Sequence, residues 1–407
     1  MMQMFSDLSD IPMDTDKEEG RIVSIHDKES IEFYKNELKA GEEVLQVLKQ
    51  KYSIPFTSPP LEYYELNNLS ALKDMDVLWD KMVNWEKKGF CERVEERPFC
   101  CNPMSVVSKV DLKTGEMKKR PCMDFSRHIN KYIEDQPVKI SHLAEAEKLL
   151  EAEDFMTSFD LENMYMQLEF NEKYWKYQGC SVTDPEGNTV YFIFKVLIYG
   201  LKSAVYAVTQ LTKPIVKKAA LLGIRLSIMI DDGRILGRNI EESRLNHDTV
   251  LHLVQKAGWN IQWKKTVSLP TQSLYHQGMI TSTKPLMYIL PDFKMKRLRD
   301  LVQWVLMAYE DGRSIDCIMF ARMIGSIVSA QRALGPLSRI LLRSSHAILN
   351  TVMEQYMNWE RKFKVPSMVA KELELLYNEM PRINGQAIIL GKTGVTLGSL
   401  LNMVENR

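Results

Sequence analysis

Three aspartates in this sequence have the residue type and spacing expected of a metal site. Asp231 and Asp232 are adjacent between two apolar runs in SIMIDDGRILG, and Asp160 ends the apolar segment FMTSFD earlier in the chain. If both segments are strands of one sheet, three carboxylates meet at its edge, where they repel one another unless cations neutralise them. Magnesium prefers a few carboxylates together with substrate phosphates, and a pair of such ions promotes phosphoryl transfer. The spacing therefore predicts a two-metal site.

Each motif also has an ordinary structural explanation. Asp-Gly between alternating apolar stretches is typical of a β-hairpin turn, in which Asp231 and Asp232 are simply solvated. Asp160 is of a residue type that often caps a following helix. The metal-site interpretation therefore depends on the joint occurrence of the motifs. A lysine filling the space between Asp160 and the tip at 231–232 would contradict it.

The flanking sequence predicts the elements that must position these aspartates. Short apolar strands around SVVSKV and RPCMDF flank the turn-rich DLKTGE and predict a hairpin. Mixed strands and helices follow, including a buried strand at YFIFKVL and a helix after YGLKSA that Pro214 should kink or break. Beyond Thr281 the apolar spacing is helical. We therefore expect a mixed α and β middle and an all-helical last third.

The composition is that of an ordinary soluble protein. The 407 residues are 45% hydrophobic, and 53 basic residues balance 53 acidic ones, so the net charge indicates no partner. The stretch from Lys284 to Arg343 is locally basic, which suits a polyanion. Six cysteines match neither a disulfide framework nor a CxxC metal pattern, and no secretory signal or long apolar run is present. We expect an intracellular protein, nuclear or cytoplasmic, with no membrane partner.

The order of the motifs resembles that of the palm of retroelement reverse transcriptases. The segments that carry the resemblance are MTSFDLENMYMQLEF, FKVLIYGLKSAVYAVTQL, SIMIDDGRILG, WNIQWKKTV and LYHQGMI. The upstream segment NPMSVVSKVDLKTGEMKKRPCMDFSRHIN is similar to the fingers hairpin of that family. The turn IDDG and the tail ARMIGSIVSAQRALGPLSRILLRS most resemble tyrosine-recombinase retrotransposons of DIRS type. The resemblance covers roughly residues 75–350.

The resemblance implies a fold and an activity. The fold is the α+β right-hand polymerase, with fingers, a palm whose antiparallel sheet packs on helices, and a helical thumb or connection. The activity is that of an RNA-directed DNA polymerase, a nucleotidyltransferase that adds dNTPs to a primer on an RNA or DNA template. Two Mg²⁺ ions, or Mn²⁺, would be held by Asp160, Asp231, Asp232 and the backbone carbonyl of Leu161. Lys265 resembles the lysine that protonates the departing pyrophosphate, although the adjacent Lys264 is not separable from it.

The resemblance also assigns the substrate contacts. Tyr165 would lie beneath the incoming sugar and exclude a 2′-hydroxyl, although the residues alone favour a core aromatic. The other nucleotide-binding residues implied are Lys109, Arg120, Tyr199 and Gly200. From the residues alone, Tyr199 is again a buried aromatic, and the hairpin cations are solvated. The nucleic-acid-binding residues implied are Lys202, Ser203, Arg322, Arg339 and Arg343, for the last three of which a solvated basic face is the commoner explanation.

The domain division follows the same motifs. We expect a partly disordered acidic extension with one helix over Lys28–Tyr52, then fingers and palm, a helical thumb or connection, and the lead-in to a ribonuclease H domain. The corresponding ranges are 1–75, 76–285, 286–357 and 358–407. After Glu379 the only acidic residue is Glu405, so no second metal site and no template degradation are expected.

Three positions depart from the family pattern. Met229 stands where an aromatic is usual, and Ile198 and Val205 replace prolines on either side of the glycine motif. These departures leave open an alternative function, a catalytically weak or inactive retroelement-derived protein that binds nucleic acid. An RNA-dependent RNA polymerase is disfavoured by Tyr165 and by GLKSA.

Overall fold

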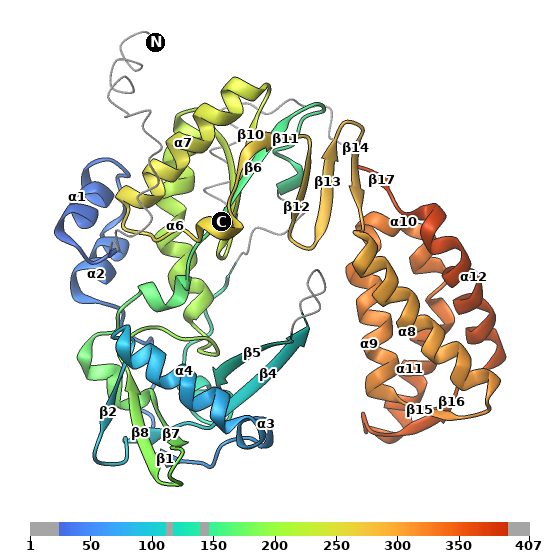
Figure 1. Cartoon of the computed structure of the whole chain (residues 1–407), viewed down its shortest axis with the longest axis horizontal. Coiled ribbons are helices and arrows are strands. Elements are labelled where there is room, and N and C mark those ends of the chain that lie inside the picture. The colour runs from blue at the N-terminus through green and yellow to red at the C-terminus, as the bar shows by residue number, and fades with distance from the viewer. Residues whose placement is uncertain (1–23, 111–116, 139–145, 390–407) are drawn as a thin grey trace.

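The computed structural model describes residues 24–110, 117–138 and 146–389. Two sheets with their helices form one side of the molecule, and a helical bundle lies on the other (Figure 1). A small sheet connects the bundle to the rest of the chain (Figure 1).

The palm sheet, as we call it, carries the three aspartates. Its strand order is β11-β6-β10-β9, and all its pairings are antiparallel. Helices α6 and α7 pack on its strands (Figure 1). The elements are β6 (Phe155–Asp160), α6 (Ala204–Leu221), β9 (Arg225–Met229), β10 (Asp232–Gly237), α7 (Ile240–Lys256) and β11 (Val267–Thr271). Gly237 permits the close approach of α7, because a Cβ there would meet the backbone of Ser243. The sheet therefore has a firm support behind its central strands.

We predicted that Pro214 would kink or break the helix after YGLKSA. Helix α6 is continuous through Pro214, so a break is wrong. A proline inside a helix removes a single hydrogen bond and crowds the preceding turn. Here Leu211, Ile215 and Val216 around it are buried in the core. Burial of these apolar side chains offsets the local loss.

The fingers sheet has the order β1-β3-β7-β8-β2. A separate hairpin of β4 and β5 projects beside it, as the sequence predicted (Figure 1). Helices α3 and α4 and short 3₁₀ turns complete this part. The elements are β1 (Tyr63–Tyr64), α3 (Leu69–Lys73), α4 (Met75–Lys87), β2 (Cys91–Val94), β3 (Cys100–Cys101), β4 (Met104–Val110), β5 (Met117–Met123), η3 (Ile129–Tyr132), η4 (Met164–Gln167), η5 (Glu172–Tyr177), β7 (Gly179–Thr183) and β8 (Thr189–Phe194).

The described part of the N-terminal region is ordered structure rather than an extension. The single helix expected over Lys28–Tyr52 is two helices, α1 (Lys28–Asn36) and α2 (Glu42–Gln50). The hydroxyl of Tyr34 donates to Leu211 O of α6 at 2.8 Å, and the indole of Trp259 donates to that hydroxyl at 2.9 Å. These buried bonds fix α1 to the palm core. Residues 1–23 lie outside the described residues.

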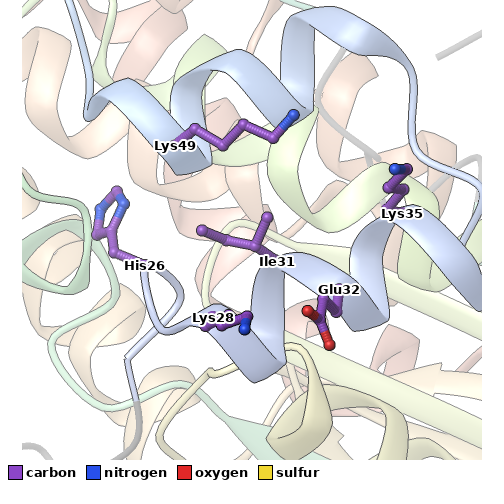
Figure 2. Close-up of a pocket in the computed structure, with 6 residues that line it drawn as sticks. All are labelled: His26, Lys28, Ile31, Glu32, Lys35 and Lys49. Atoms are coloured by element: carbon purple, nitrogen blue, oxygen red, sulfur yellow. The ribbon is translucent and has the colours of Figure 1, made fainter.

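A cavity of about 400 Å³ opens between α1 and α2. Figure 2 shows its lining of His26, Lys28, Ile31, Glu32, Lys35 and Lys49. None of these residues belongs to the predicted site. His26 is committed to structure there, because its Nδ1 lies 2.8 Å from Leu48 O and its Nε2 accepts from the Glu169 N–H at 3.0 Å.

The helical bundle has its own core and extends past residue 357, the predicted end of the thumb. Helix α12 packs against α8, and its Val369, Leu373 and Leu376 are buried in the bundle core. The bundle elements are α8 (Asp292–Glu310), β15 (Ser314–Asp316), α9 (Cys317–Ser329), α10 (Gln331–Ile340), α11 (Arg343–Tyr356), β16 (Lys362–Lys364) and α12 (Ser367–Ile383). The connecting sheet is β12 (Ser273–His276), β13 (Met279–Thr283), β14 (Leu286–Ile289) and β17 (Gln386–Ala387).

His247 of α7 predicts a pH-dependent loss of stability. It is buried, neither ring nitrogen has a hydrogen-bond partner among the described residues, and burial lowers its pKa from 6.5 to about 4. Below pH 6.5 the imidazole of His247 is protonated in the unfolded chain, whereas in the folded chain it stays neutral down to about pH 4. The free energy of unfolding therefore falls as the pH falls through this window. We expect this residue to cost roughly 2 kcal/mol between pH 7.5 and pH 5.

Urea unfolding at both pH values measures this effect. His247→Met should flatten the pH dependence by that amount, whereas His346→Met, at an exposed position of α11, should leave it unchanged. Equal slopes for wild type and His247→Met would show that burial of His247 does not control its protonation.

Candidate active site

The palm sheet brings the three aspartates to one edge. Asp232 of β10 is the cross-strand partner of Asp160 of β6, and β10 pairs with β9 so that Asp232 lies opposite Met229. Ile230 and Asp231 form the turn between β9 and β10. The Leu161 N–H donates to Asp231 O at 2.8 Å, which ties this turn to the chain leaving β6. The convergence inferred from sequence is therefore present, although the predicted roles of the residues remain predictions.

The turn that presents Asp231 is strained. Ile230 has φ 61°, in the left-handed region. A β-branched residue rarely adopts this conformation, because its side chain crowds the backbone. Strain of this kind persists only where the surroundings enforce it, and it is often found at functional sites. Here the β9–β10 pairing and the Leu161 bond supply that constraint.

Asp231 is in an unfavourable environment for a carboxylate. Its pKa is raised, first by burial and then by the neighbouring charges of Asp160 and Asp232. A hydrogen bond from its own backbone and the charge of Lys265 oppose this shift only in part. A divalent cation placed between these carboxylates would remove the repulsion that raises the pKa.

Lys265 contacts Asp160 directly. It belongs to the 3₁₀ turn η6 (Trp263–Lys265), and its Nζ donates to Oδ1 and Oδ2 of Asp160 at 2.8 and 2.9 Å. The structure thus distinguishes Lys265 from Lys264, which makes no hydrogen bond to Asp160. A metal on Asp160 must displace this ammonium or share the carboxylate with it. The lysine side chain is 60% exposed, and such pairs contribute only about 0–1 kcal/mol. Its hydrogen bonds go to Asp160, and its charge also acts on Asp231.

Removing Lys265 should therefore strengthen divalent-cation binding. We expect Lys265→Met to raise the affinity for Mn²⁺ about fivefold, since roughly 1 kcal/mol of competition at Asp160 is lost. Lys264→Met removes the same charge next to it and serves as the control. Isothermal titration with MnCl₂ measures both. Identical affinities for the two variants would show that the contact with Asp160 does not compete with the metal.

Two buried polar side chains behind Asp232, His276 and Arg234, were missed by the sequence reasoning. His276 of β12 is buried, with its Nδ1 3.0 Å from Asp232 Oδ1 but not aligned for a hydrogen bond. Arg234 is fully buried on the same face of β10 as Asp232, and its Nη2 donates to Ala146 O at 2.8 Å. The alternation of a strand placed Arg234 on that face and could have identified it. The position of His276 near Asp232 could not be predicted without knowing that β12 packs against β6.

Tyr165 and Tyr199, two of the predicted nucleotide-binding residues, lie close to Asp231. Tyr165 of η4 is buried and packs edge-on against Tyr199, with ring centroids 5.0 Å apart. Burial, followed by the charge of Asp231, raises the pKa of Tyr165 to about 12, so it is a neutral phenol. Tyr199 is 44% exposed, so it is not the buried aromatic that the residues alone suggested. Gly200 has φ 106°, and a Cβ there would clash with Met123 O.

The two hairpin cations share one face of β4 and β5. Arg120 pairs across from Val107 and Lys109 from Lys118, so strand alternation directs all four side chains to the same side. Arg120 is close enough to Tyr199 to lower its pKa, against the larger opposing effect of burial. The hairpin thus places at least Arg120 near the aspartate edge.

The predicted nucleic-acid-binding residues lie in different surroundings. Ser203 directly precedes α6, and its side chain is buried and therefore not exposed to a ligand. The ammonium of Lys202 donates to Ile133 O at 3.0 Å and forms an ion pair with Asp135 at 2.6 Å, so its partners lie within the chain. Arg322, Arg339 and Arg343 are exposed on the bundle, where no contact joins them to the aspartates.

The donor set of the site suits magnesium. Within the described residues, no three His, Cys, Asp or Glu side chains form a ready-made metal cage. Magnesium does not need such a cage, because it binds through one or two carboxylates and substrate phosphates. The oxygen-only donors of Asp160, Asp231 and Asp232, whose repulsion lacks full compensation, match that preference.

Comparison with solved structures identifies the fold. No protein-family model and no curated protein sequence matches the chain. The foamy viral protease-reverse transcriptase in complex with dsDNA matches with a TM-score of 0.59 and 15% identity, over 89% of this chain and 73% of that one. Its complex with an RNA/DNA hybrid gives 0.59 and 15%, over 86% and 46%. The dRH form with ds DNA gives 0.57 and 15%, over 88% and 60%.

The chain thus has a reverse transcriptase fold, and the predicted right-hand polymerase architecture is confirmed. It spans 46–73% of the length of these neighbours. The DIRS-type assignment stays a prediction. No helix in the part of the chain that the structure describes is long and apolar enough to cross a bilayer.

Proposed function

We propose that this chain is an RNA-directed DNA polymerase that adds deoxynucleotides to the 3′ end of a primer on an RNA or DNA template. The observation that carries the proposal is the convergence of Asp160, Asp231 and Asp232 at one sheet edge, beside the Tyr165–Tyr199 pair. The likeness to foamy viral reverse transcriptase supports it at the level of the fold. The neighbours were solved with dsDNA and with an RNA/DNA hybrid, which supports a nucleic-acid partner for this chain.

The chain would contribute position and charge. Asp160, Asp231 and Asp232 would hold two Mg²⁺ ions, with the carbonyl of Leu161 as a further ligand. When bound, these ions supply Lewis-acid activation of the primer hydroxyl and charge stabilisation of the pyrophosphate. Arg120 and Lys109 would bind the triphosphate from the hairpin.

Selectivity and proton transfer would come from three further residues. The ring of Tyr165 would lie beneath the sugar and leave no room for a 2′-hydroxyl, while Tyr199 would pack on the nucleotide. Lys265, released from Asp160 by the metal, would be free to donate its proton to the leaving pyrophosphate. Most of the rate would then come from orientation and preorganised charge.

A primer-extension assay tests the proposal. Purified chain, poly(rA)–oligo(dT), dTTP and Mg²⁺ or Mn²⁺ should yield extended primer, and EDTA should abolish the product. Template-independent addition, or no addition at all under these conditions, would contradict it. Salt-sensitive binding of the duplex without extension would instead support the alternative of an inactive nucleic-acid-binding protein, which Met229, Ile198 and Val205 motivate.

A further inference from the structure

The loop that carries Tyr199 is held by one side chain from outside the aspartate site. Asn130 Nδ2 donates to Gly200 O at 2.9 Å, and Asn130 Oδ1 accepts from the Lys202 N–H at 2.9 Å. A single planar amide thus satisfies a donor and an acceptor on either side of Leu201, which is itself buried. An amide side chain carries a donor and an acceptor on neighbouring atoms, which suits this arrangement.

Asn130 is itself held firmly. It lies in η3, where the neighbouring Ile129 is fully buried and the Asn130 N–H donates to Phe125 O at 3.0 Å. The loop makes a second hydrogen bond to this segment, because Lys202 Nζ donates at 3.0 Å to the carbonyl oxygen of Ile133, which directly follows η3. The loop is therefore attached at several points to a rigid support rather than to another loop.

The loop conformation determines where Tyr199 lies. Gly200 has φ 106° and passes so close to Met123 O that no side chain fits. Asn130 fixes the peptide between Gly200 and Leu201, and so constrains the residue that directly follows Tyr199. That ring packs on Tyr165 and is close enough to Asp231 to be affected by its charge. Loss of the Asn130 side chain would therefore change the position of Tyr199 on the nucleotide side of the site.

We infer that Asn130 is a positioning residue, which orients the Tyr199–Lys202 loop so that Tyr199 packs correctly against the incoming nucleotide. The inference rests on the proposed function. It assigns Asn130 no contact with substrate, and it gives Lys202 a tethering role in place of the nucleic-acid contact expected from sequence. Loss of the amide should weaken nucleotide binding more than it slows the chemical step.

Two variants test the inference. Asn130→Ala removes both hydrogen bonds, and Asn130→Asp keeps the acceptor for Lys202 but places a carboxylate oxygen against Gly200 O. Each should raise the KM for dTTP about tenfold, the factor that corresponds to roughly 1.4 kcal/mol of lost positioning, while kcat falls less than about threefold. The amide of Lys202 should exchange with deuterium about tenfold faster.

Asn171 provides a matched control. Its side chain donates to Gln50 O at 3.0 Å and accepts from the Lys173 N–H at 3.2 Å, so it makes the same two kinds of bond away from the loop. Asn171→Ala should match Asn130→Ala in thermal stability but leave the KM for dTTP and the Lys202 exchange unchanged. If the Asn130 variants behave like Asn171→Ala, or exchange faster with unchanged KM, the inference is wrong.

The same experiments separate this inference from the proposed function. If the wild-type chain extends no primer, the proposed function fails and the role at the nucleotide fails with it. If the wild type extends primer and the Asn130 variants keep its KM, only the positioning role fails.

Discussion

Asp231→Asn should reduce dTTP incorporation on poly(rA)–oligo(dT) by about a thousandfold or more. Asp231 is in the turn between β9 and β10, and an amide cannot replace the negative charge that the proposed pair of metal ions requires. Loss of about 4 kcal/mol of charge stabilisation corresponds to that factor. Steady-state incorporation at saturating dTTP and Mg²⁺ measures the effect.

The same substitution should not weaken the fold. Because the folded-state pKa of Asp231 is raised, its carboxylate is less favourable in the folded chain than in the unfolded chain at neutral pH. Its contribution to stability therefore declines as the pH rises through the folded-state pKa, and asparagine removes that cost. The variant should melt at or above the wild-type temperature at pH 7.5. A variant that is inactive because it is unfolded would not support the account.

Tyr165→Val should reduce the preference for dTTP over UTP by about a hundredfold. The Tyr165 ring is buried between the turn of Asp231 and Tyr199, and its removal opens space for a 2′-hydroxyl. Exclusion by shape of one small group corresponds to discrimination of this size. Competing UTP against dTTP on the same primer measures the ratio of their kcat/KM values.

Tyr165→Phe is the control for this prediction. It keeps the ring and removes only the hydroxyl, which is neutral because the pKa is raised to about 12. It should retain the wild-type preference. If valine and phenylalanine at this position select equally well against UTP, the ring does not contact the sugar, and Tyr165 is a core aromatic only.

The central part of the fold could be predicted from the sequence because its signals are local. Strand alternation and an Asp-Gly turn predicted the β9–β10 hairpin, and two apolar strands around a polar turn predicted β4 and β5. The N-terminal helices were predicted as one helix because the apolar spacing persists across the break. The break itself depends on Lys39, with φ 49°, and on the entry to α2 at Gly41.

The parts of the site that were missed depend on contacts between distant segments. His276 meets Asp232 only because β12 packs beside β6, and no local pattern encodes that packing. Ser203 was expected to face nucleic acid but is buried, because the loop before α6 folds onto η3. Lys265 could be predicted to lie near the site, yet its bond to Asp160 required the fold.

Burial of charge is a common feature of the region beneath the site. Arg225 forms a bidentate pair with Asp154 at 2.6 and 2.7 Å, with both side chains buried, and Arg234 is buried close by. Breaking such a pair leaves an uncompensated charge and typically costs about 3–5 kcal/mol. The Arg225–Asp154 pair joins the start of β9 to the residue before β6, and these two strands flank β10 in the palm sheet.

Binding of Mn²⁺, followed by electron paramagnetic resonance, tests the central claim most directly. In the presence of poly(rA)–oligo(dT) and a non-hydrolysable dTTP analogue, the wild-type chain should bind two Mn²⁺ ions whose spectra show spin coupling, as expected for ions about 4 Å apart. Asp160→Asn and Asp231→Asn should each lose the coupled signal. Retention of that signal in both variants, or no Mn²⁺ bound by the wild type, would show that the three carboxylates do not form a metal site.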